Sequence, residues 1–491
     1  MSFSGGMRGR ILRSFGADSL GQVLNIGIRL MLVPLFLSTW GAEAYGEWLI
    51  LTALAAWFAL GDLGGQLYFI NRLTAEWAAG KIDVFQRVLS TGLLLFIVSS
   101  GLLLGVALLA VSWLPIASWL ELKAVDHDLV KAILLLMALR FSVSLPVGLF
   151  LGIYRAIGVQ ATSVMYGNLI LMIQFVASAL ALLAGGGMLL LASLEVVPFL
   201  LVFVAVIWDL RRRLPKEVRL FALANADRSI LRSAISPSLH FLGLQLSMAI
   251  IIQGSVIVVA KTLGPVEVAI FSSMRIVANA MSRFMGVLAH AAWPEITRLA
   301  ILGQDEKLAK LFTIILNLAL FVGLCYLVLI VNFGQMLYNW WLNNNLPYDS
   351  WVMYLLSCQV VMTVLWTWGG NLLMATNRHE EYARWQFPVN LVALFLCYWG
   401  AVEFGLLGAV VGLFAGQSMP MLLIVYFLLV QKGWHQIAFS LVITSLAGLV
   451  LLPMTLNVWS GLLGIALVLV LSFGRYKWVI NRIKERRNSS K

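Results

Sequence analysis

Residues 89–113 read LSTGLLLFIVSSGLLLGVALLAVSW and contain no charged side chain. A run of this length is enough for the roughly twenty helical residues that cross the ~30 Å hydrocarbon core of a bilayer. A soluble domain needs charged groups to cover its surface, yet only 11% of the 491 residues are charged and 61% are hydrophobic. The stretch therefore predicts a membrane-spanning helix, and the composition predicts an integral membrane protein.

Further apolar runs of similar length predict an all-α, polytopic membrane protein with about 14 transmembrane helices. The predicted spans are 16–37, 48–70, 89–113, 133–154, 161–184, 188–208, 234–260, 266–292, 311–333, 351–375, 386–402, 405–430, 437–456 and 459–478. The first run resembles a signal sequence because arginines precede it. Polar residues interrupt this run and no small-residue cleavage site follows, so we expect a retained span.

The positions of Lys and Arg test the number of spans. Fourteen spans place both termini on one side. If that side is the cytoplasm, 27 of the 34 Lys and Arg residues lie on the cytoplasmic side, counting Arg475 and Lys477 at the inner end of the last span, and only Lys123, Lys131 and Lys261 lie in outside loops. Basic residues concentrate on the cytoplasmic side of membrane proteins, so this bias supports the count. The basic residues behind the net charge of +12 therefore set the membrane topology and meet anionic lipid headgroups. They do not indicate nucleic-acid binding.

The spans divide into two sets of six followed by a final pair. We predict an N-terminal six-helix bundle over 1–210, a basic cytoplasmic linker over 211–233, a C-terminal six-helix bundle over 234–431, and two extra transmembrane helices with a basic cytoplasmic tail over 432–491. The outside turns after spans one and seven both place a glycine (Gly41, Gly264) shortly before a glutamate. A parallel repeat of the two halves is one hypothesis, and chance similarity is the other.

Small residues recur at helical spacing in two spans. Gly408, Gly412 and Gly416 form a small-xxx-small row in span twelve, and Gly148 and Gly152 form a shorter row in span four. Such rows allow the backbones of neighbouring helices to approach closely, so we interpret them as packing positions.

Polar groups inside the predicted spans are the candidate functional residues, because an ionisable side chain at bilayer depth costs about 2.5–3.5 kcal/mol. In span one they follow one helical face. The candidate substrate-binding residues are Arg29, Arg140, Arg275, Arg283, Gln22, Asn25, Asn279 and His290. Four arginines outnumber the three intramembrane acids, which predicts a cationic cavity and an anionic substrate. The guanidinium fork suits phosphate oxygens. The alternative is that these polar groups only join neighbouring helices.

The three intramembrane acids, Asp18, Asp62 and Glu195, are candidates for coupling to H+ or Na+. A carboxylate that titrates within the membrane can link ion movement to a conformational change. The alternative is a structural salt bridge or hydrogen bond.

Other site classes have no signature here. The five His residues lack metal-ligand spacing, and the three Cys residues lie in apolar runs, which favours small buried hydrophobes. Neither a Gly-x-x-x-x-Gly-Lys motif nor a His-Glu-x-x-His motif is present, since Ala383 stands where the second His is needed. We therefore predict no catalytic site, no metal site and no cofactor.

Several short stretches in spans one and two resemble a known family. They are Asn25–Leu30 (NIGIRL), Val33–Leu37 (VPLFL), Trp40-Gly41, Tyr45–Trp48 (YGEW) and Leu60–Gly64 (LGDLG). Together they resemble the opening of the polysaccharide transporter family. These are Wzx-type flippases of the multidrug/oligosaccharidyl-lipid/polysaccharide exporter superfamily. Beyond span two the resemblance is one of topology.

The resemblance implies a MATE-like pair of bundles that alternates between inward- and outward-facing states. It implies that an undecaprenyl-pyrophosphate-linked oligosaccharide moves from the cytoplasmic to the periplasmic leaflet of a bacterial inner membrane, for lipopolysaccharide O-antigen or exopolysaccharide synthesis. Polysaccharide assembly proteins are implied partners. Arg29 stands where the family commonly has a basic residue, and spans thirteen and fourteen resemble an additional pair that helps form a lipid-accommodating groove.

Three alternatives stay open. A peptidoglycan lipid II flippase shares fourteen spans and a cationic cavity. A drug/cation antiporter usually has twelve spans and binds cations, which four intramembrane arginines disfavour. A membrane polysaccharide polymerase or ligase would carry acid/base residues in a large outside loop, whereas the largest outside loop, about 114–132, has only His127.

Overall fold

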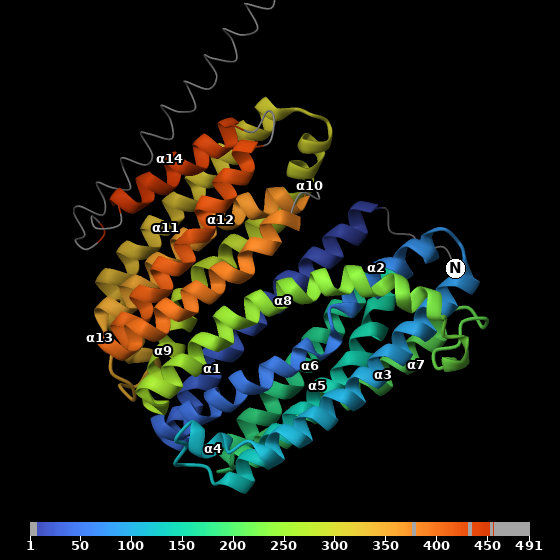
Figure 1. Cartoon of the computed structure of the whole chain (residues 1–491), viewed down its shortest axis with the longest axis horizontal. Coiled ribbons are helices and arrows are strands. Elements are labelled where there is room, and N and C mark those ends of the chain that lie inside the picture. The colour runs from blue at the N-terminus through green and yellow to red at the C-terminus, as the bar shows by residue number, and fades with distance from the viewer. Residues whose placement is uncertain (1–6, 376–379, 431–434, 452–454, 456–491) are drawn as a thin grey trace, which may run out of the picture. The chain divides into compact units, whose positions relative to one another are not determined.

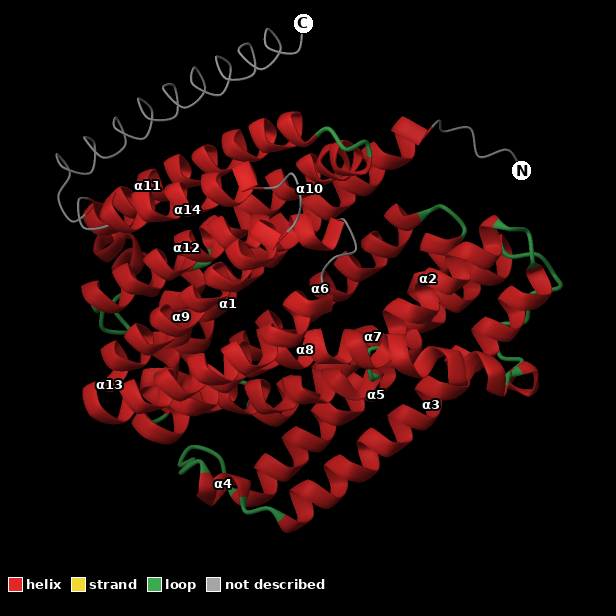
Figure 2. Cartoon of the chain, turned by 45° about the horizontal axis from the view of Figure 1, so that its top comes forward, coloured by secondary structure: helices red, strands yellow, loops and turns green. Residues whose placement is uncertain are grey.

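The computed structural model describes residues 7–375, 380–430, 435–451 and 455, and Figure 1 shows their arrangement. Within these residues the chain is helical and contains no β-strand (Figure 2), which confirms the all-α fold class. The elements in order are α1 (Met7–Ala55), η1 (Ala56–Asp62), α2 (Gly65–Ala78), α3 (Ile82–Trp113), α4 (Ile116–Trp119), α5 (His127–Ala156), α6 (Gln160–Leu183), α7 (Met188–Arg213), η2 (Leu223–Asn225), α8 (Arg228–Leu263), α9 (Pro265–Ala278), α10 (Ala280–Ile301), α11 (Asp305–Leu342), α12 (Ser350–Ala375), α13 (Glu380–Val430) and α14 (His435–Leu451).

The helices correspond to the predicted spans. Within the described part of the chain, nine helical segments are long and apolar enough to cross a membrane. Two of them, Gly16–Asp62 and Arg384–Val430, are 47 residues long, and each contains a kink between two predicted spans. Predicted span two ends in a separate helix, α2, and span eight is divided between α9 and α10. The fourteenth predicted span, 459–478, lies outside the described residues.

Glycines with positive φ mark three of the turns that the charge bias predicts to lie outside. Gly41 interrupts α1 with φ 78° and ψ 176°, and Gly264 separates α8 from α9 with φ 99° and ψ 178°. Gly405 has φ 63° at the kink in α13. L-residues with a Cβ rarely adopt this region, so glycine is needed at each turn. The shared backbone conformation of Gly41 and Gly264 supports the hypothesis of a parallel repeat.

An aromatic cluster surrounds the kink in α1. The rings of Phe36 and Tyr45 are stacked with centroids 5.2 Å apart, and those of Trp40 and Trp48 meet edge-on at 5.9 Å. The Trp40 Nε1–H donates to the carbonyl oxygen of Gly186, in the turn between α6 and α7, at 3.0 Å. Aromatic pairs in these geometries add stability beyond the area that they bury. The cluster therefore fixes the angle between the two parts of α1.

The chain forms two compact units, Met1–Ala269 and Ile270–Lys491. In the first unit, α5 packs against both α3 and α7, around buried residues that include Phe69, Phe96 and Phe150. This unit also contains α8, which packs against α1, α2 and α3. The sequence-based division places α8 with the C-terminal bundle, and those domain bounds stay a prediction.

Two glycine rows pack as expected. In α13 a Cβ on Gly408, Gly412 or Gly416 would clash with backbone atoms of residues 393–400, on the other side of the kink. In α5 a Cβ on Gly148 or Gly152 would clash with the Gln66 or Ile70 side chain of α2. The packing interpretation of both rows is confirmed.

In the second unit, α14 is an integral part of the packing. Ile437, Ala438 and Leu441 are buried, and α14 packs against α11, α12 and α13. The hydroxyl groups of Ser440 and Thr313 lie 2.8 Å apart, which joins α14 to α11. Thr313 and Ser440 therefore add a polar contact to the apolar packing of α14.

The segment between α7 and α8 is folded onto the first unit. Leu214, Val218 and Leu220 are buried in the core. The Gln86 side chain of α3 donates to the carbonyl oxygen of Arg219 at 2.9 Å and accepts from its N–H at 2.7 Å. The Asp227 carboxylate then accepts from the Ser229 N–H at 2.8 Å and caps α8. This basic connection is thus held at defined points along its length.

Candidate functional site

The polar face of α1 is the most distinct candidate site in the first unit. Asp18, Gln22 and Arg29 are exposed and Asn25 is half-buried. The Arg29 Nε–H donates to the Asn25 side-chain oxygen at 3.1 Å, one helical turn away. The structure therefore brings these four predicted residues together on one face of a membrane-spanning helix.

The other faces of α1 have different surroundings. On one side the helix packs against α6, where the Asn168 amide donates to the carbonyl oxygen of Ala17 at 3.0 Å. The side roughly opposite the polar face exposes the apolar residues Leu20, Val23, Leu30 and Met31. A helix with one exposed apolar face and one exposed polar face suits a boundary between lipid and water. The polar face is then the one that belongs to a hydrated space, because lipid would penalise its charges.

A second polar stripe lies on α8 in the same unit. Arg232, Ser236 and His240 follow at spacings of four residues and are exposed. The His240 Nδ1 lies 2.8 Å from the carbonyl oxygen of Ser236. The sequence-based candidates do not include this stripe, because Arg232 lies before the predicted span 234–260 and Ser236 near its start. The spacing of four residues, extended to the true start of α8, is the signal that would have found them.

Arg140 and Glu195 form an ion pair within the first unit. The Arg140 Nε lies 3.1 Å from Glu195 Oε2, and the side chains are 26% and 24% exposed. The Gln174 amide of α6 donates to the same carboxylate oxygen at 2.7 Å. The Phe141 and Phe199 rings lie 4.8 and 5.3 Å from the guanidinium carbon. The charge of Arg140 is thus largely neutralised, and Glu195 adopts the salt bridge that the sequence left open as its structural alternative.

Asp62 stands at a break in the second predicted span. Its Oδ1 accepts from the Gly64 N–H at 2.9 Å, and its Oδ2 accepts from the Gln245 amide of α8 at 3.3 Å. Leu63 and Gly64 both have positive φ, of 51° and 71°. A Cβ on Gly64 would clash with the backbone of α8 at Ser238 and Leu242. Asp62 therefore holds a helix interruption against α8. This is the structural hydrogen bond that the sequence left open as the alternative to ion coupling.

The candidates of the second unit lie at another helix interruption. Asn279 separates α9 from α10, and its side-chain amide donates to the carbonyl oxygen of Arg275 at 2.9 Å. The guanidinium of Arg275 lies 4.8 Å from the Phe271 ring centre. Arg275, Asn279 and Arg283 are half-buried. The side chain of His290, which completes the predicted set, lies outside the described part of the structure.

The predicted substrate-binding residues thus form three local groups. The α1 face with Arg29 and the Arg140 pair lie in the first unit, and the Arg275–Arg283 segment lies in the second. Each unit holds its own arginines.

Metal and thiol chemistry are not evident in the described residues. No group of three or more His, Cys, Asp or Glu side chains there could hold a metal ion. Cys325, Cys358 and Cys397 are free thiols, of which Cys358 and Cys397 are buried. The interpretation of the latter two as small buried hydrophobes is confirmed.

The fold is that of known transporters. A MATE-family multidrug resistance transporter of the MOP superfamily, in an inward-facing conformation, aligns with a TM-score of 0.70 and 14% identity over 88% of this chain and 95% of that chain. The lipid II flippase MurJ aligns with a TM-score of 0.66 and 14% identity over 96% of this chain and 99% of that chain. A MOP superfamily transporter from Pyrococcus furiosus aligns with a TM-score of 0.58 and 14% identity over 92% of this chain and 97% of that chain.

No protein-family model and no curated protein matches the sequence. The MATE-like fold is therefore established by structure, at an identity too low to carry function with it.

Proposed function

We propose that this protein is a flippase that translocates a polyprenyl-pyrophosphate-linked oligosaccharide from the cytoplasmic to the periplasmic leaflet of a bacterial inner membrane. Transport proceeds by alternating access and serves surface polysaccharide synthesis. The protein acts as a transporter, not as an enzyme, and both termini are cytoplasmic.

One observation carries the proposal: Arg29 is exposed on the polar face of a spanning helix whose other exposed face is apolar. Such a helix offers a guanidinium to a hydrated space at membrane depth, where it can bind phosphate bidentately. Gln22 and Asn25 on the same face provide amide groups for sugar hydroxyls. A substrate with an anionic headgroup, polar sugars and a lipid tail fits both exposed faces of α1.

The other candidates take supporting roles in this proposal. Arg275, Arg283 and Asn279, with His290, contribute a second set of phosphate and sugar ligands. Arg140 exchanges Glu195 for a substrate phosphate, and Asp18, Asp62 or Glu195 couples the cycle to H+ or Na+. Polysaccharide assembly proteins receive the product on the periplasmic side.

The test is a flipping assay in proteoliposomes with fluorescent polyprenyl-pyrophosphate oligosaccharide. Replacing Arg29 with Ala removes a charge-assisted contact, so we expect the flipping rate at low substrate to fall by about 10- to 100-fold. Arg29→Lys keeps the charge but not the fork and should lose less. Arg155→Ala, which removes an exposed arginine in the last turn of α5, is the matched control and should flip normally. A normal rate for Arg29→Ala at normal protein level would overturn the role of Arg29.

A lipid II flippase is the second candidate, because the similarity to MurJ covers 96% of this chain and 99% of that chain. Lipid II and the polyprenyl-linked oligosaccharide are therefore offered in parallel. Faster flipping of lipid II would replace the first proposal. A third arm with a cationic dye tests the antiporter alternative.

A further inference from the structure

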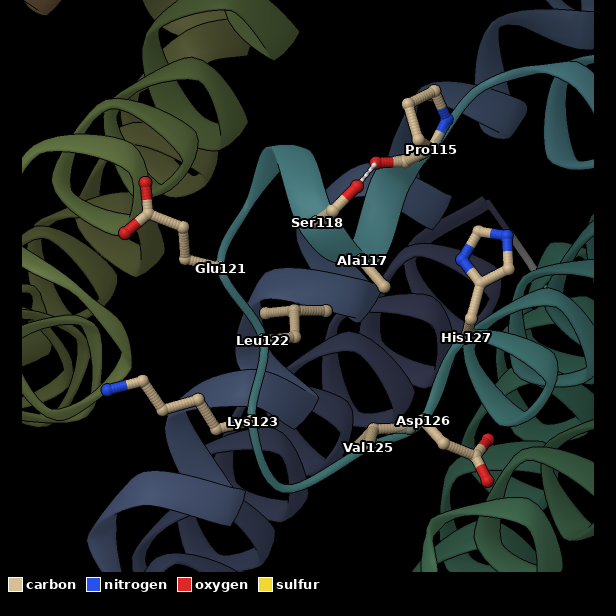
Figure 3. A pocket seen from close by; sticks show the side chains of 9 residues that line it. All are labelled: Pro115, Ala117, Ser118, Glu121, Leu122, Lys123, Val125, Asp126 and His127. Atoms are coloured by element: carbon tan, nitrogen blue, oxygen red, sulfur yellow. Dashed lines mark hydrogen bonds between the residues drawn. The ribbon is translucent and has the colours of Figure 1, made fainter.

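The outside loop between α3 and α5 is folded rather than extended. It contains the one-turn helix α4 (Ile116–Trp119), and its own residues Ala117, Leu120 and Val125 are buried. The loop lines an open cavity of about 550 Å³. Figure 3 shows Glu121 and Lys123 extending from one side of the loop, with Asp126 and His127 on the other.

A buried glutamate side chain holds this loop to α1. Glu47, six residues after the Gly41 kink, is 0% exposed. Its Oε1 accepts from the backbone N–H groups of Lys123 and Ala124 at 2.5 and 2.8 Å. Two hydrogen bonds to one buried side chain satisfy backbone N–H groups that water would otherwise bind. The backbone next to Glu121 is therefore fixed relative to α1.

Glu121 joins the fixed loop to the outer end of α8. Its Oε1 accepts from the Lys261 ammonium at 3.0 Å, and the two side chains are 73% and 40% exposed. Glu121 has a φ of 54°, a left-handed conformation that is uncommon for a residue with a Cβ. The buried anchor at residues 123–124 and the exposed ion pair at 121 lie within four residues of each other.

Lys261 lies where α8 ends and the chain turns into α9. It lies in the last turn of α8, and Gly264 with φ 99° follows directly. A Cβ on Gly46 would clash with the carbonyl of Pro265, so α1 touches the backbone just beyond this turn. The outer end of α8 also buries Val256, Val259 and Ala260, so the Glu121–Lys261 pair is an exposed contact beside a packed apolar one. The ion pair is the contact that solvent and charge can break.

We propose that the Glu121–Lys261 pair is a lock that holds the outer end of α8 against the Glu47-anchored loop and opens during the transport cycle. This inference rests on the proposed function, because alternating access requires an outer end that opens. An exposed ion pair is individually weak, which suits a contact that forms and breaks in each cycle. The anchor at Glu47 keeps Glu121 in place so that the pair can form again.

The test measures the distance between the loop and α8 by pulsed electron paramagnetic resonance. Spin labels are placed at Ser118 and Thr262 of the membrane-embedded protein, which leaves the ion pair intact, after replacement of the three native cysteines. We expect a major short distance and a minor longer one. Glu121→Lys places like charges together at Lys261 and Lys123, so the longer population should rise by roughly two- to fivefold.

Two further variants make the result specific. The charge swap Glu121→Lys with Lys261→Glu should restore the original distances and a normal flipping rate. Asp128→Lys reverses an exposed acid that pairs with Lys131 at 3.5 Å on α5, and it should change nothing. A distribution that Glu121→Lys leaves unaltered would overturn the lock, as would a swap that fails to restore it.

The distance measurement needs no substrate, so the two proposals fail separately. If the wild-type protein flips none of the offered lipids but Glu121→Lys still lengthens the distance, the lock stands and the proposed substrate falls. If flipping is normal and the distance between the two labels is the same in every variant, the lock is wrong and the proposed flippase function is kept.

Discussion

At the scale of single residues, the ion pair of Arg140 and Glu195 illustrates how charges are accommodated inside the first unit. Gln174 donates to the same carboxylate, and two phenylalanine rings flank the guanidinium. Removing one partner of such a pair leaves an uncompensated charge, whereas replacing both can be neutral for stability. A variant that replaces both partners can therefore be stable, and its flipping rate then shows whether the pair also binds substrate.

We expect Arg140→Met alone to lower the free energy of unfolding by about 1–3 kcal/mol, because the Glu195 carboxylate loses its cation. Adding Glu195→Gln should restore most of that loss. Thermal unfolding in detergent measures both changes. If Arg140 also binds phosphate, the stable double variant still flips slowly. Wild-type flipping by the double variant would assign the pair a purely structural role.

The pairing of Arg140 with Glu195 also shows where sequence reasoning stops at this scale. The sequence placed both groups inside spans and left a salt bridge open as one reading. It could not choose the partner, because the residues lie on different helices, α5 and α7, and only their packing brings them within 3.1 Å. The face of α1 needed no such information, since Asp18 to Arg29 belong to one continuous helix.

At the scale of elements, the interruption at Asp62–Gly64 is the feature that hydropathy did not reveal. The sequence predicted one continuous span over 48–70, yet the helix changes to a 3-10 turn at Ala56 and restarts at Gly65. Hydropathy records only that the segment is apolar. The break depends on the positive φ of Leu63 and Gly64 and on the close approach of α8.

We expect Gly64→Ala to destabilise the protein by more than the roughly 1–2 kcal/mol that a left-handed backbone costs an L-residue, because the new Cβ also clashes with α8. Gly80→Ala is the matched control, since Gly80 has a φ of 69° with open space around its Cβ position. Chemical denaturation measures the free energy of unfolding of both variants. Gly80→Ala gives the cost of the left-handed backbone alone, and the additional loss in Gly64→Ala gives the cost of the clash. Equal losses would show that α8 moves aside at no cost.

At the scale of the whole molecule, hydrophobic length and charge bias predicted most of the helices. Apart from their ends and the interruptions at Leu63–Gly64 and Asn279, the predicted spans that fall in the described residues lie in helix, because a spanning segment must satisfy its backbone hydrogen bonds within the bilayer. The outer loop was predicted far less well. The sequence identified only His127 there, whereas Glu47 and Lys261, which hold the loop, lie 76 and 140 residues from their partners.

The lock should respond to acid. The hydrogen bond and charge of Lys261, with a smaller effect of Lys123, lower the pKa of Glu121 below its ordinary value of 4.5. The pair is therefore intact at neutral pH and is lost as the pH falls through this lowered pKa. We expect the distance between labels at Ser118 and Thr262 to lengthen between pH 7 and about pH 3.

Glu121→Gln supplies the control for this titration. It cannot ionise, so its distance distribution should stay the same across the range. An acid response that persists in Glu121→Gln would assign the titration to another group.

The two hydrogen bonds between the Gln86 side chain and the Arg219 backbone have a practical consequence for engineering this protein. Residues 214–227 would ordinarily be chosen for inserting a reporter domain, because they form a long basic connection between the helices α7 and α8. A splice there would pull apart the Gln86 bonds and expose Leu214, Val218 and Leu220. The exposed turn at Ala79–Lys81 carries no such burial and is the better place for an inserted tag.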